Sequence, residues 1–290
     1  MTLSRKRQPC HFHGNRLYFA QGWQEKLEEI GLCQGSRWDE LEPGELVTCS
    51  KRTNAYRVTL ESGETVYFKR YLYLGKPFKF YLRPSETAVE VFSYNEMAKL
   101  GIPVAEPLAV GEIRRCGSLF AACIVTRGIP DTMNLKDYAM YEWSLLAPKL
   151  RREAFMMISE TVCRDLQTMH KARFFHFDSK WRNILIRKNE SEKIVGLWWI
   201  DSPRGKKLPT IRCEYGTIYD LANLCRMALS FLSRSQRLRF LYNYLDPNMT
   251  QKEVRIIAKK INRHLQRNPP KLAPTLASNQ KVEKSSDHTV

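Results

Sequence analysis

The feature that most constrains this chain is a segment in which polar side chains follow apolar stretches at fixed spacing. Asp178 and Asn183 stand five residues apart in the run His176-Phe-Asp-Ser-Lys-Trp-Arg-Asn183. A second carboxylate, Asp201, follows the apolar run that ends at Ile200. Short strands that carry these residues at their ends would direct all three side chains into one cleft. The pattern therefore predicts a polar site in the C-terminal half of the chain.

These residue types in this order fit phosphoryl transfer. One carboxylate must accept the proton of the attacking hydroxyl, and an amide and a second carboxylate must hold Mg²⁺ on nucleotide phosphates. We therefore predict Asp178 as the general base, and Asn183 and Asp201 as the metal ligands. Taken singly, each residue could equally be a loop turn or a strand cap, so the prediction depends on their combined spacing.

The residues before this segment predict a small, strand-rich lobe. A helix with apolar residues on one face ends at Gly101, ahead of Pro103. Alternating and apolar runs bounded by turn residues predict five strands around it. We place this N-lobe, a five-stranded sheet plus one helix, at residues 1–128. The five predicted strands are Leu46–Ser50, Ala55–Leu60, Thr65–Tyr73, Ala109–Gly111 and Leu119–Thr126.

The remainder is predicted to be mainly helical, with the catalytic segment between helices. Arg151–His170 has apolar residues at helical spacing, and Ile218–Leu232 is apolar nearly all round. A last amphipathic helix runs through Val254 and Leu265. We place the helical C-lobe at residues 129–267 and expect 268–290, rich in Pro, Ser, Lys and Asn, to be disordered. The predicted class is α+β with two lobes.

The motifs and their order resemble the protein-kinase-like superfamily. His176-x-Asp178-x4-Asn183 is similar to its catalytic loop, and Asp201-x-x-x-Gly205 stands where its metal-binding Asp belongs. The finer resemblance is to the lipopolysaccharide-core sugar kinases, that is, the heptose and Kdo kinases and their InaA-like relatives. It covers roughly residues 45–265. The further stretches that carry it are Tyr67-Phe-Lys-Arg-Tyr71, Glu90 to Val104, and Ile200-Asp-Ser-Pro-Arg-Gly-Lys206.

The resemblance implies ATP and Mg²⁺ as cofactors and assigns further residues. Lys69 matches the lysine that binds the α- and β-phosphates, and Glu90 matches its partner on the helix, with Glu96 as the competing candidate. Lys180 matches the loop lysine that neutralises the transferred phosphoryl group. The remaining matches are the hinge around adenine, at Thr126 and Gly128, and the aspartate that braces the catalytic loop, at Asp220.

Two departures from the wider superfamily bear on function. The turn between the first two predicted strands lacks Gly-x-Gly, which leaves Lys51, Arg52 and Asn54 as candidates for phosphate contact. In addition, no Ala-Pro-Glu follows Gly205 and the insert there is short. This argues against a protein kinase that docks peptides.

Charge favours anionic partners. The 47 Lys and Arg against 30 Asp and Glu give a net charge of +17. Such an excess favours acidic lipids, phosphorylated sugars or nucleic acid, but no nucleic-acid motif is present. Basic residues around the catalytic segment suggest an acceptor that carries phosphates or carboxylates: Arg182, Arg204, Lys206, Lys207 and Arg212. A second set is a candidate for peripheral contact with an anionic membrane: Arg5, Lys6, Arg7, Lys149, Arg151, Arg152, Lys259 and Lys260.

The location expected for the protein is cytoplasmic, with peripheral attachment to the inner face of the inner membrane as a further expectation. The eight cysteines show no pairing pattern, and the basic start is not followed by an apolar run typical of a signal peptide.

The expected activity is transfer of phosphate from ATP to a sugar hydroxyl of the lipopolysaccharide inner core. Three alternatives remain open at this point: a small-molecule or antibiotic phosphotransferase, an atypical protein kinase, and a non-catalytic nucleotide-binding pseudokinase.

Overall fold

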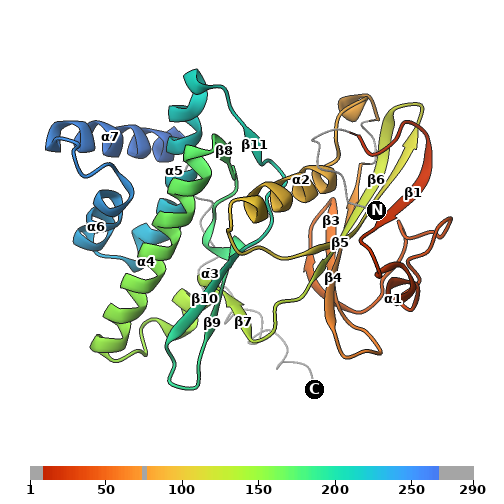
Figure 1. Ribbon diagram of the computed structural model, residues 1–290, viewed down its shortest axis with the longest axis horizontal. Helices are drawn as coiled ribbons and strands as arrows, with labels where there is room; N and C mark the ends of the chain where they lie inside the picture. Colours follow the sequence, from red (N-terminus) through yellow and green to blue (C-terminus); the bar gives the residue numbers. More distant parts are fainter. Residues whose placement is uncertain (1–8, 74–76, 268–290) are drawn as a thin grey trace, which may run out of the picture.

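The protein, described here from a computed structural model over residues 9–73 and 77–267, consists of two lobes that lie side by side (Figure 1). A mainly antiparallel sheet with one long helix forms the N-lobe, and helices with short strand pairs form the C-lobe. A cavity of about 790 Å³ lies between residues of both lobes, including Tyr67 of the sheet and Ile186 of the helical lobe. The α+β, bilobal architecture expected from the sequence is confirmed.

The N-lobe sheet has six strands in the order β1-β5-β6-β4-β3-β2, one more than the five predicted. The additional strand pairs Gly14–Phe19 with Ala109–Arg114. Only Leu17 and Phe19 of this strand are buried, and its partner is distant in sequence, so the local pattern was too weak to reveal it. The strands are β1 (Gly14–Phe19), β2 (Glu45–Cys49), β3 (Thr53–Thr59), β4 (Thr65–Leu72), β5 (Pro107–Arg115) and β6 (Ser118–Arg127).

Helix α2 (Glu86–Lys99) lies between the sheet and the C-lobe (Figure 1). It begins where the Ser85 side chain accepts a hydrogen bond from the Ala88 amide, and ends ahead of Gly101, whose φ of +72° favours glycine. The structure adds a short helix α1 (Gln24–Glu28) and a 3-10 turn η1 (Pro77–Phe80) to the N-lobe. Helix α2 is buried on most of its surface, so it can position residues of both the N-lobe sheet and the C-lobe.

The C-lobe contains the three predicted helices and two that the sequence pattern did not reveal, the single turn α3 and the longer α6. Helix α6 buries only Leu241 and Tyr244, so its apolar stripe is weak, although Ser233 and Gln236 form a capping box at its start. The elements in chain order are β7 (Thr132–Asn134), α3 (Leu135–Asp137), η2 (Tyr138–Glu142), α4 (Pro148–Lys171), β8 (Phe174–Phe175), η3 (Trp181–Asn183), β9 (Ile184–Lys188), β10 (Ile194–Trp199), β11 (Lys206–Lys207), η4 (Thr210–Arg212), α5 (Cys213–Phe231), α6 (Arg234–Tyr244) and α7 (Gln251–Arg267).

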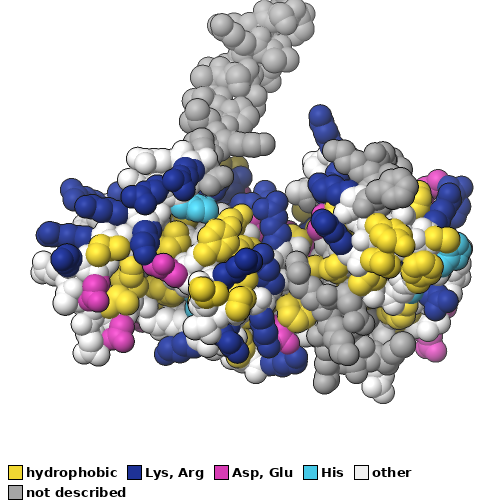
Figure 2. Space-filling model, turned by 90° about the horizontal axis from the view of Figure 1, so that it is seen from above, with side chains coloured by type: hydrophobic (Ala, Val, Ile, Leu, Met, Phe, Trp, Pro, Cys, Tyr) yellow, Lys and Arg dark blue, Asp and Glu magenta, His cyan; other side chains and the backbone are white. Residues whose placement is uncertain are grey.

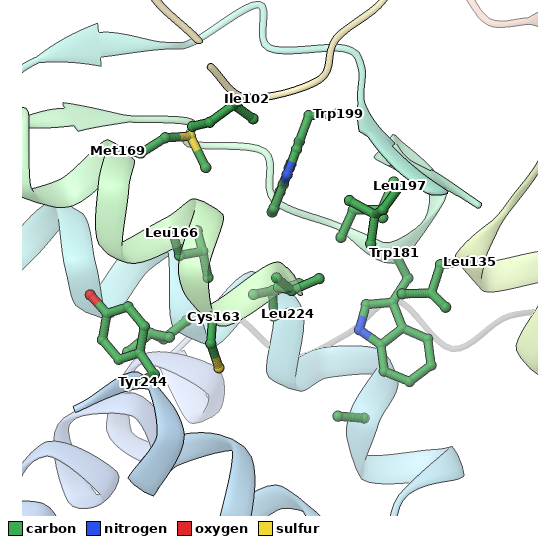
Figure 3. Close-up of a cluster of buried hydrophobic side chains, with 14 of the residues drawn as sticks. Ile102, Leu135, Cys163, Leu166, Met169, Trp181, Leu197, Trp199, Leu224 and Tyr244 are labelled. Carbon is green, nitrogen blue, oxygen red and sulfur yellow. The ribbon is translucent and has the colours of Figure 1, made fainter. Parts of the chain in front are cut away.

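A continuous core ties the catalytic segment to the long helices. Leu166 and Met169 of α4, Trp199 of β10 and Leu224 of α5 belong to one buried cluster (Figure 3). The Trp199 side chain is fully buried, and its Nε1 donates to Asp165 Oδ2 at 3.0 Å. Burial of side chains of this size contributes about 1.5–3 kcal/mol each. The core therefore anchors β10, which leads directly into Asp201.

Two of the predicted segments, residues 1–8 with Arg5, Lys6 and Arg7 and the tail 268–290, lie outside the described residues. Within the described ranges, no helix combines the length and apolar character that a membrane crossing requires. The boundary between the lobes near Gly128 stays a prediction.

Candidate active site

The side chain of Asp220, on α5, is fully buried and hydrogen-bonds the backbone of the loop that carries Asp178. Its Oδ2 accepts a hydrogen bond from the His176 amide at 2.9 Å, and its Oδ1 accepts one from the Phe177 amide at 2.8 Å. The Ser179 hydroxyl donates to the Asp220 carbonyl at 2.8 Å. Phe177 has a φ of +59°, a left-handed conformation that a bulky residue adopts only under strong constraint. Asp220 supplies that constraint and so fixes the loop that carries Asp178.

Asp178 lies at the centre of a compact polar cluster. Asn183 Nδ2 donates to the Asp178 carbonyl at 2.8 Å and to Asp178 Oδ2 at 2.9 Å. Lys180 Nζ lies 2.5 Å from Asp178 Oδ1, and Arg182 Nη2 lies 4.0 Å from Oδ2. Burial alone would raise the pKa of Asp178, but the Lys180 ammonium and the Asn183 bond outweigh it and hold the pKa below its ordinary value. The carboxylate is therefore ionised at neutral pH.

Asp201 is positioned by contacts to its backbone. Its φ is +57°, a left-handed conformation that Asp tolerates better than most residues. Its amide donates to Tyr94 Oη of α2 at 3.0 Å, and its carbonyl accepts from Asn183 Nδ2 at 3.3 Å. Beside it, Ser93 Oγ donates to the Ser202 carbonyl at 3.0 Å. Helix α2 therefore holds the Asp201 loop directly, and the side chain remains 38% exposed.

Lys69 joins the two lobes at this point. Its Nζ lies 3.1 Å from Glu90 Oε1 and 2.7 Å from Asp201 Oδ1, and Tyr71 Oη donates to Glu90 Oε1 at 2.6 Å. Burial would lower the pKa of Lys69, but the two carboxylates raise it, so the ammonium stays charged. Burial raises the pKa of Glu90 to about 7 against the opposing effect of Lys69.

Of the two candidate partners for Lys69, Glu90 is the one in contact. Glu96, on the same helix, instead lies 2.5 Å from Lys99 Nζ and 2.6 Å from Lys207 Nζ. The second of these pairs links α2 to β11, beyond the Asp201 loop. The two glutamates therefore have different positions: one faces the phosphate-binding lysine, and the other faces the segment that follows Asp201.

Of the two predicted hinge residues, Gly128 lines the 790 Å³ cavity, and Thr126 lies one residue before the lining segment 127–133. The Gly128 amide already donates to the Thr65 carbonyl at 2.7 Å, so it is engaged within the protein. A Cβ at this position would lie 2.8 Å from the same oxygen, which explains the glycine. Thr126 pairs with Tyr67 inside the sheet. The cavity is lined largely by polar and charged residues such as Arg57, Glu64 and Lys188, and Tyr67 and Met133 add surfaces that suit contact with a planar base.

The turn between β2 and β3 is closed by side chains in place of glycines. Ser50 Oγ accepts from the Thr53 amide at 3.1 Å, and the Ser50 amide donates to the Thr53 carbonyl at 2.8 Å. Arg52, one of the candidates for phosphate contact, instead pairs with Glu86 at the start of α2, at 3.1 Å. Asn54 Nδ2 donates to Tyr56 Oη at 3.4 Å. Lys51 is exposed, and of the three candidates it alone forms no hydrogen bond or ion pair within the described residues.

The arrangement fits a divalent cation of the Mg²⁺ type. The Asn183 amide nitrogen donates to three oxygens, one on Asp201 and two on Asp178, which leaves its Oδ1 as the remaining ligand atom. The partly exposed Asp201 carboxylate is the second oxygen donor. Hard oxygen ligands of this kind, completed by phosphate oxygens and water, are the coordination that Mg²⁺ prefers.

The basic residues predicted around the site occupy different environments. Arg182 is 60% exposed and Arg212 is exposed, so both are available to an anionic acceptor. Arg204 Nη1 donates to Tyr219 Oη at 3.4 Å, and Lys206 Nζ lies 4.6 Å from the ring centroid of Phe177. Lys207 is paired with Glu96, as described above, and therefore has a structural contact.

Sequence reasoning missed the residues of α2 and β4 that support the site. Tyr94, Ser93 and Tyr71 stand in helix and strand patterns that look like ordinary core. Only the folded chain brings Tyr94 to the Asp201 amide, across 107 residues. The spacing of Tyr94 one helical turn after Glu90 was the one available signal, because residues four apart share a helix face.

Comparison with known proteins adds the family. A family model described as the lipopolysaccharide kinase (Kdo/WaaP) family matches residues 69–244. Among solved structures, WaaP in complex with acyl carrier protein is similar, with a TM-score of 0.60, 18% identity, and coverage of 87% of this chain and 98% of that chain. At this identity the likeness concerns the fold, and the search of curated proteins found no match. Since the family model spans more than half of the chain, the protein belongs to the lipopolysaccharide kinase (Kdo/WaaP) family, whose members are kinases acting on sugar hydroxyls.

Proposed function

We propose that the protein uses ATP and Mg²⁺ to phosphorylate a heptose or Kdo hydroxyl of the lipopolysaccharide inner core. The observation that supports this most strongly is the unbroken polar chain across the lobes. It runs from Glu90 through Lys69 and Asp201 to Asn183 and Asp178. These are the groups that phosphoryl transfer requires, in contact and in an order that places nucleotide phosphates beside a general base.

Asp178 has the role of orienting the acceptor hydroxyl and accepting its proton. Its low pKa is no obstacle, because in phosphoryl transfer positioning and charge stabilisation lower the barrier more than basicity does. Lys180, 2.5 Å from Asp178 and 36% exposed, is placed to stabilise the negative charge of the group in transfer. Asn183 holds the Asp178 carboxylate in a single orientation.

Lys69 binds the α- and β-phosphates, fixed by Glu90, while Asn183 Oδ1 and the Asp201 carboxylate hold Mg²⁺. When bound, Mg²⁺ neutralises charge on the phosphate oxygens. The Lys69–Asp201 pair would separate on nucleotide binding, leaving the Lys69 ammonium for phosphate oxygens and the Asp201 carboxylate for the cation. The base occupies the cavity that Gly128 and the residues after it line.

The acceptor approaches from the side of the C-lobe that carries Arg182, Arg204 and Arg212. Guanidinium groups bind phosphate and carboxylate in bidentate fashion, which suits the charged sugars of an inner core. A protein substrate is disfavoured because only eleven residues separate Asp201 from α5, which leaves little chain for a peptide-docking segment.

The test is transfer of labelled phosphate from ATP by the purified full chain. We expect incorporation into delipidated core oligosaccharide, and none into a panel of aminoglycosides or a generic protein substrate. Turnover of a soluble small molecule in preference to the core would assign the alternative acceptor class. Nucleotide binding with no transfer to any acceptor would assign a pseudokinase.

Replacing Glu90 by Gln is expected to raise the KM for ATP about tenfold, with a smaller fall in kcat. The change removes the charge that fixes Lys69, and a lost contact to a charged group costs about 1.5–3 kcal/mol. Steady-state kinetics with varied ATP measures it. Glu96→Gln is the matched control on the same helix and should leave the KM unchanged. Equal effects of the two variants would contradict the assignment of Glu90.

Replacing Tyr94 by Phe is expected to raise the Mg²⁺ concentration needed for half-maximal rate several-fold, with little change in the KM for ATP. The variant leaves the Asp201 amide without its hydroxyl partner, at a cost of about 1–2 kcal/mol. Titration of activity with Mg²⁺ measures the shift. The control is Tyr138→Phe, because the buried Tyr138 hydroxyl has no partner among the described residues. An unchanged Mg²⁺ dependence in Tyr94→Phe would rule out the positioning role.

We propose a second property, binding of an acyl carrier protein. A cavity of about 570 Å³ lies among α4, α5, α6 and α7, lined largely by apolar side chains such as Phe155, Leu224 and Leu241. Its volume is in the range of ligand sites, and Arg234 and Arg237 also line it. The structural neighbour was solved with an acyl carrier protein, and an acyl chain is a suitable occupant for such a cavity.

Mixing the protein with acylated and unacylated carrier protein tests this second proposal. Size-exclusion chromatography should show a complex that depends on the acyl chain. Ala228→Leu, which narrows the cavity, should weaken it at least tenfold. A complex that forms equally well without the acyl chain, or that the substitution leaves unchanged, would contradict the assigned cavity.

A further inference from the structure

Three exposed apolar side chains meet at the turn between β5 and β6. Phe12, Tyr81 and Leu82 are 55%, 47% and 53% exposed. A Cβ at Gly117 would lie 2.9–3.1 Å from an atom of each, so all three surround a single point. Exposed apolar side chains that cluster in this way are typical of a surface that contacts a protein, a membrane or a ligand. We call these three side chains the N-lobe patch.

Basic residues flank the N-lobe patch in sequence. Lys79, Arg83 and Arg115 are exposed next to it in sequence, and none forms an ion pair within the described ranges. The acidic residue nearest in sequence to the turn, Glu112, is fully buried against Arg114. Glu86, four residues after Leu82, is paired with Arg52. An apolar patch flanked by unpaired basic residues favours an anionic partner with an apolar interior.

The buried ion pair between Arg114 and Glu112 holds together the segments that carry the N-lobe patch. Arg114 donates from Nε to Glu112 at 2.6 Å, from Nη1 to the Gly117 carbonyl at 3.0 Å and from Nη2 to the Arg83 carbonyl at 2.7 Å. Glu112 also accepts from the Cys10 amide at 3.0 Å. Burying two charges is costly, and here the pair fixes the three segments that carry the N-lobe patch. The patch is therefore preformed.

The C-lobe carries a similar group on the acceptor side of the site. Ile211 is 91% exposed and Tyr215 is 55% exposed, in η4 and the first turn of α5. Arg204 and Arg212 lie in the same stretch, and neither forms an ion pair within the parts of the chain that are described. We call Ile211 and Tyr215 the C-lobe patch.

The two patches lie at one end of the molecule. In Figure 1 the β5–β6 turn and the start of α5 are both at the top, whereas β7, which follows the hinge, is at the bottom. Figure 2 looks onto the upper end, where hydrophobic side chains gather on both lobes among many Lys and Arg and few Asp and Glu. In the proposed function the nucleotide base binds beside the hinge, near the lower end. The acceptor would therefore approach the active site from the upper end.

We infer that this end of the molecule docks on an anionic lipid bilayer, with the N-lobe and C-lobe patches entering the headgroup region on either side of the active site. The inference rests on the proposed function, because a bilayer is where a lipid-anchored acceptor is held. Exposed Tyr, Phe, Leu and Ile with flanking Lys and Arg are the composition of interfacial membrane contacts. Helix α4 begins at the other end of the molecule in Figure 1, so its first turns, which carry Lys149 and Arg152, are not part of this surface.

Sedimentation with vesicles tests the inference directly. The full chain should bind vesicles of phosphatidylethanolamine with phosphatidylglycerol, and bind neutral phosphatidylcholine vesicles at least tenfold more weakly. The triple variant Phe12→Ser, Tyr81→Ser, Leu82→Asn should lower the partition coefficient at least tenfold. Asn suits position 82 because Leu82 has a φ of +50°. Removing the charges of Lys79, Arg83 and Arg115 should cost about fivefold each, and this loss should shrink as salt is raised.

The matched control removes equally exposed apolar groups elsewhere. Tyr141 and Leu145 are 65% and 82% exposed and precede α4, whose start lies at the opposite end of the molecule in Figure 1. Tyr141→Ser with Leu145→Asn should leave vesicle binding unchanged. ATP binding and the melting temperature, measured for every variant, establish that each one is folded.

Several results would overturn the inference: no binding of the full chain to anionic vesicles, equal binding to neutral ones, or equal losses in the N-lobe variant and the control. Self-association that the N-lobe variant abolishes, without vesicle binding, would assign the surface to a second copy instead. Activity on delipidated core separates this test from the proposed function. Vesicle binding without phosphorylation of that acceptor would refute the activity and leave the docking surface standing.

Discussion

Replacing Asp178 by Asn is expected to lower kcat about a thousandfold while leaving ATP affinity nearly unchanged. The variant keeps the shape of the side chain and removes the group that accepts the acceptor's proton. The contacts of Lys69 with Glu90 and Asp201 do not involve Asp178, so nucleotide binding persists. Single-turnover transfer to the core acceptor measures the chemical step, and calorimetric titration with ATP measures binding.

Asp246→Asn is the matched control, because Asp246 is exposed and only caps its own loop. Since the pKa of Asp178 lies below its ordinary value, we also expect the wild-type rate to show no acid limb from this group above about pH 5. Activity retained in Asp178→Asn, or an equal loss in the control, would refute the assignment of the base.

Replacing Asp220 by Ala is expected to lower the free energy of unfolding by about 3–5 kcal/mol and to abolish activity. The change leaves the His176 and Phe177 amides buried without their carboxylate partner and removes the constraint on the left-handed φ of Phe177. Chemical denaturation followed by circular dichroism measures the stability. Asp178 would then be misplaced even in the molecules that remain folded.

Asp220→Asn provides the comparison for this prediction. It retains one acceptor oxygen of the same shape, so we expect roughly half of the stability loss and a measurable residual rate. A stability loss in Asp220→Ala of less than about 1 kcal/mol would show that the catalytic loop holds its conformation without the brace.

The parts of the site that are local in sequence were predictable from residue chemistry. Asp178 and Asn183 lie five residues apart, and their contact follows from one tight loop. The pairing of Lys69 with Asp201 spans 132 residues. No periodicity or spacing can specify a contact at that separation. The resemblance to a known family assigned both residues to the nucleotide phosphates and their metal ion, but it did not predict that they pair. Glu90 was chosen over Glu96 by its distance from Gly101, and the ion pair with Lys69 agrees with that choice.

Other features depend on tertiary structure that local patterns do not encode. Strand β1 is defined by its pairing with β5, which is distant in sequence. Helix α6 has too few buried residues to show a clear apolar face in the sequence. Tyr94 reads as a core residue until the fold brings its hydroxyl to Asp201. The N-lobe patch likewise combines Phe12 with Tyr81 and Leu82, which are brought together by the backbone hydrogen bonds of Phe12 and Leu82 to Gly117 and by the bonds of Arg114.

The most direct test of the central claim is mass spectrometry of the lipopolysaccharide core from cells with and without the gene. Cells that lack it, and cells complemented with Asp178→Asn, should carry a core with one phosphate fewer, and the wild-type gene should restore that phosphate. A core that is identical in all three strains would contradict the proposed acceptor, whatever the activity of the purified protein.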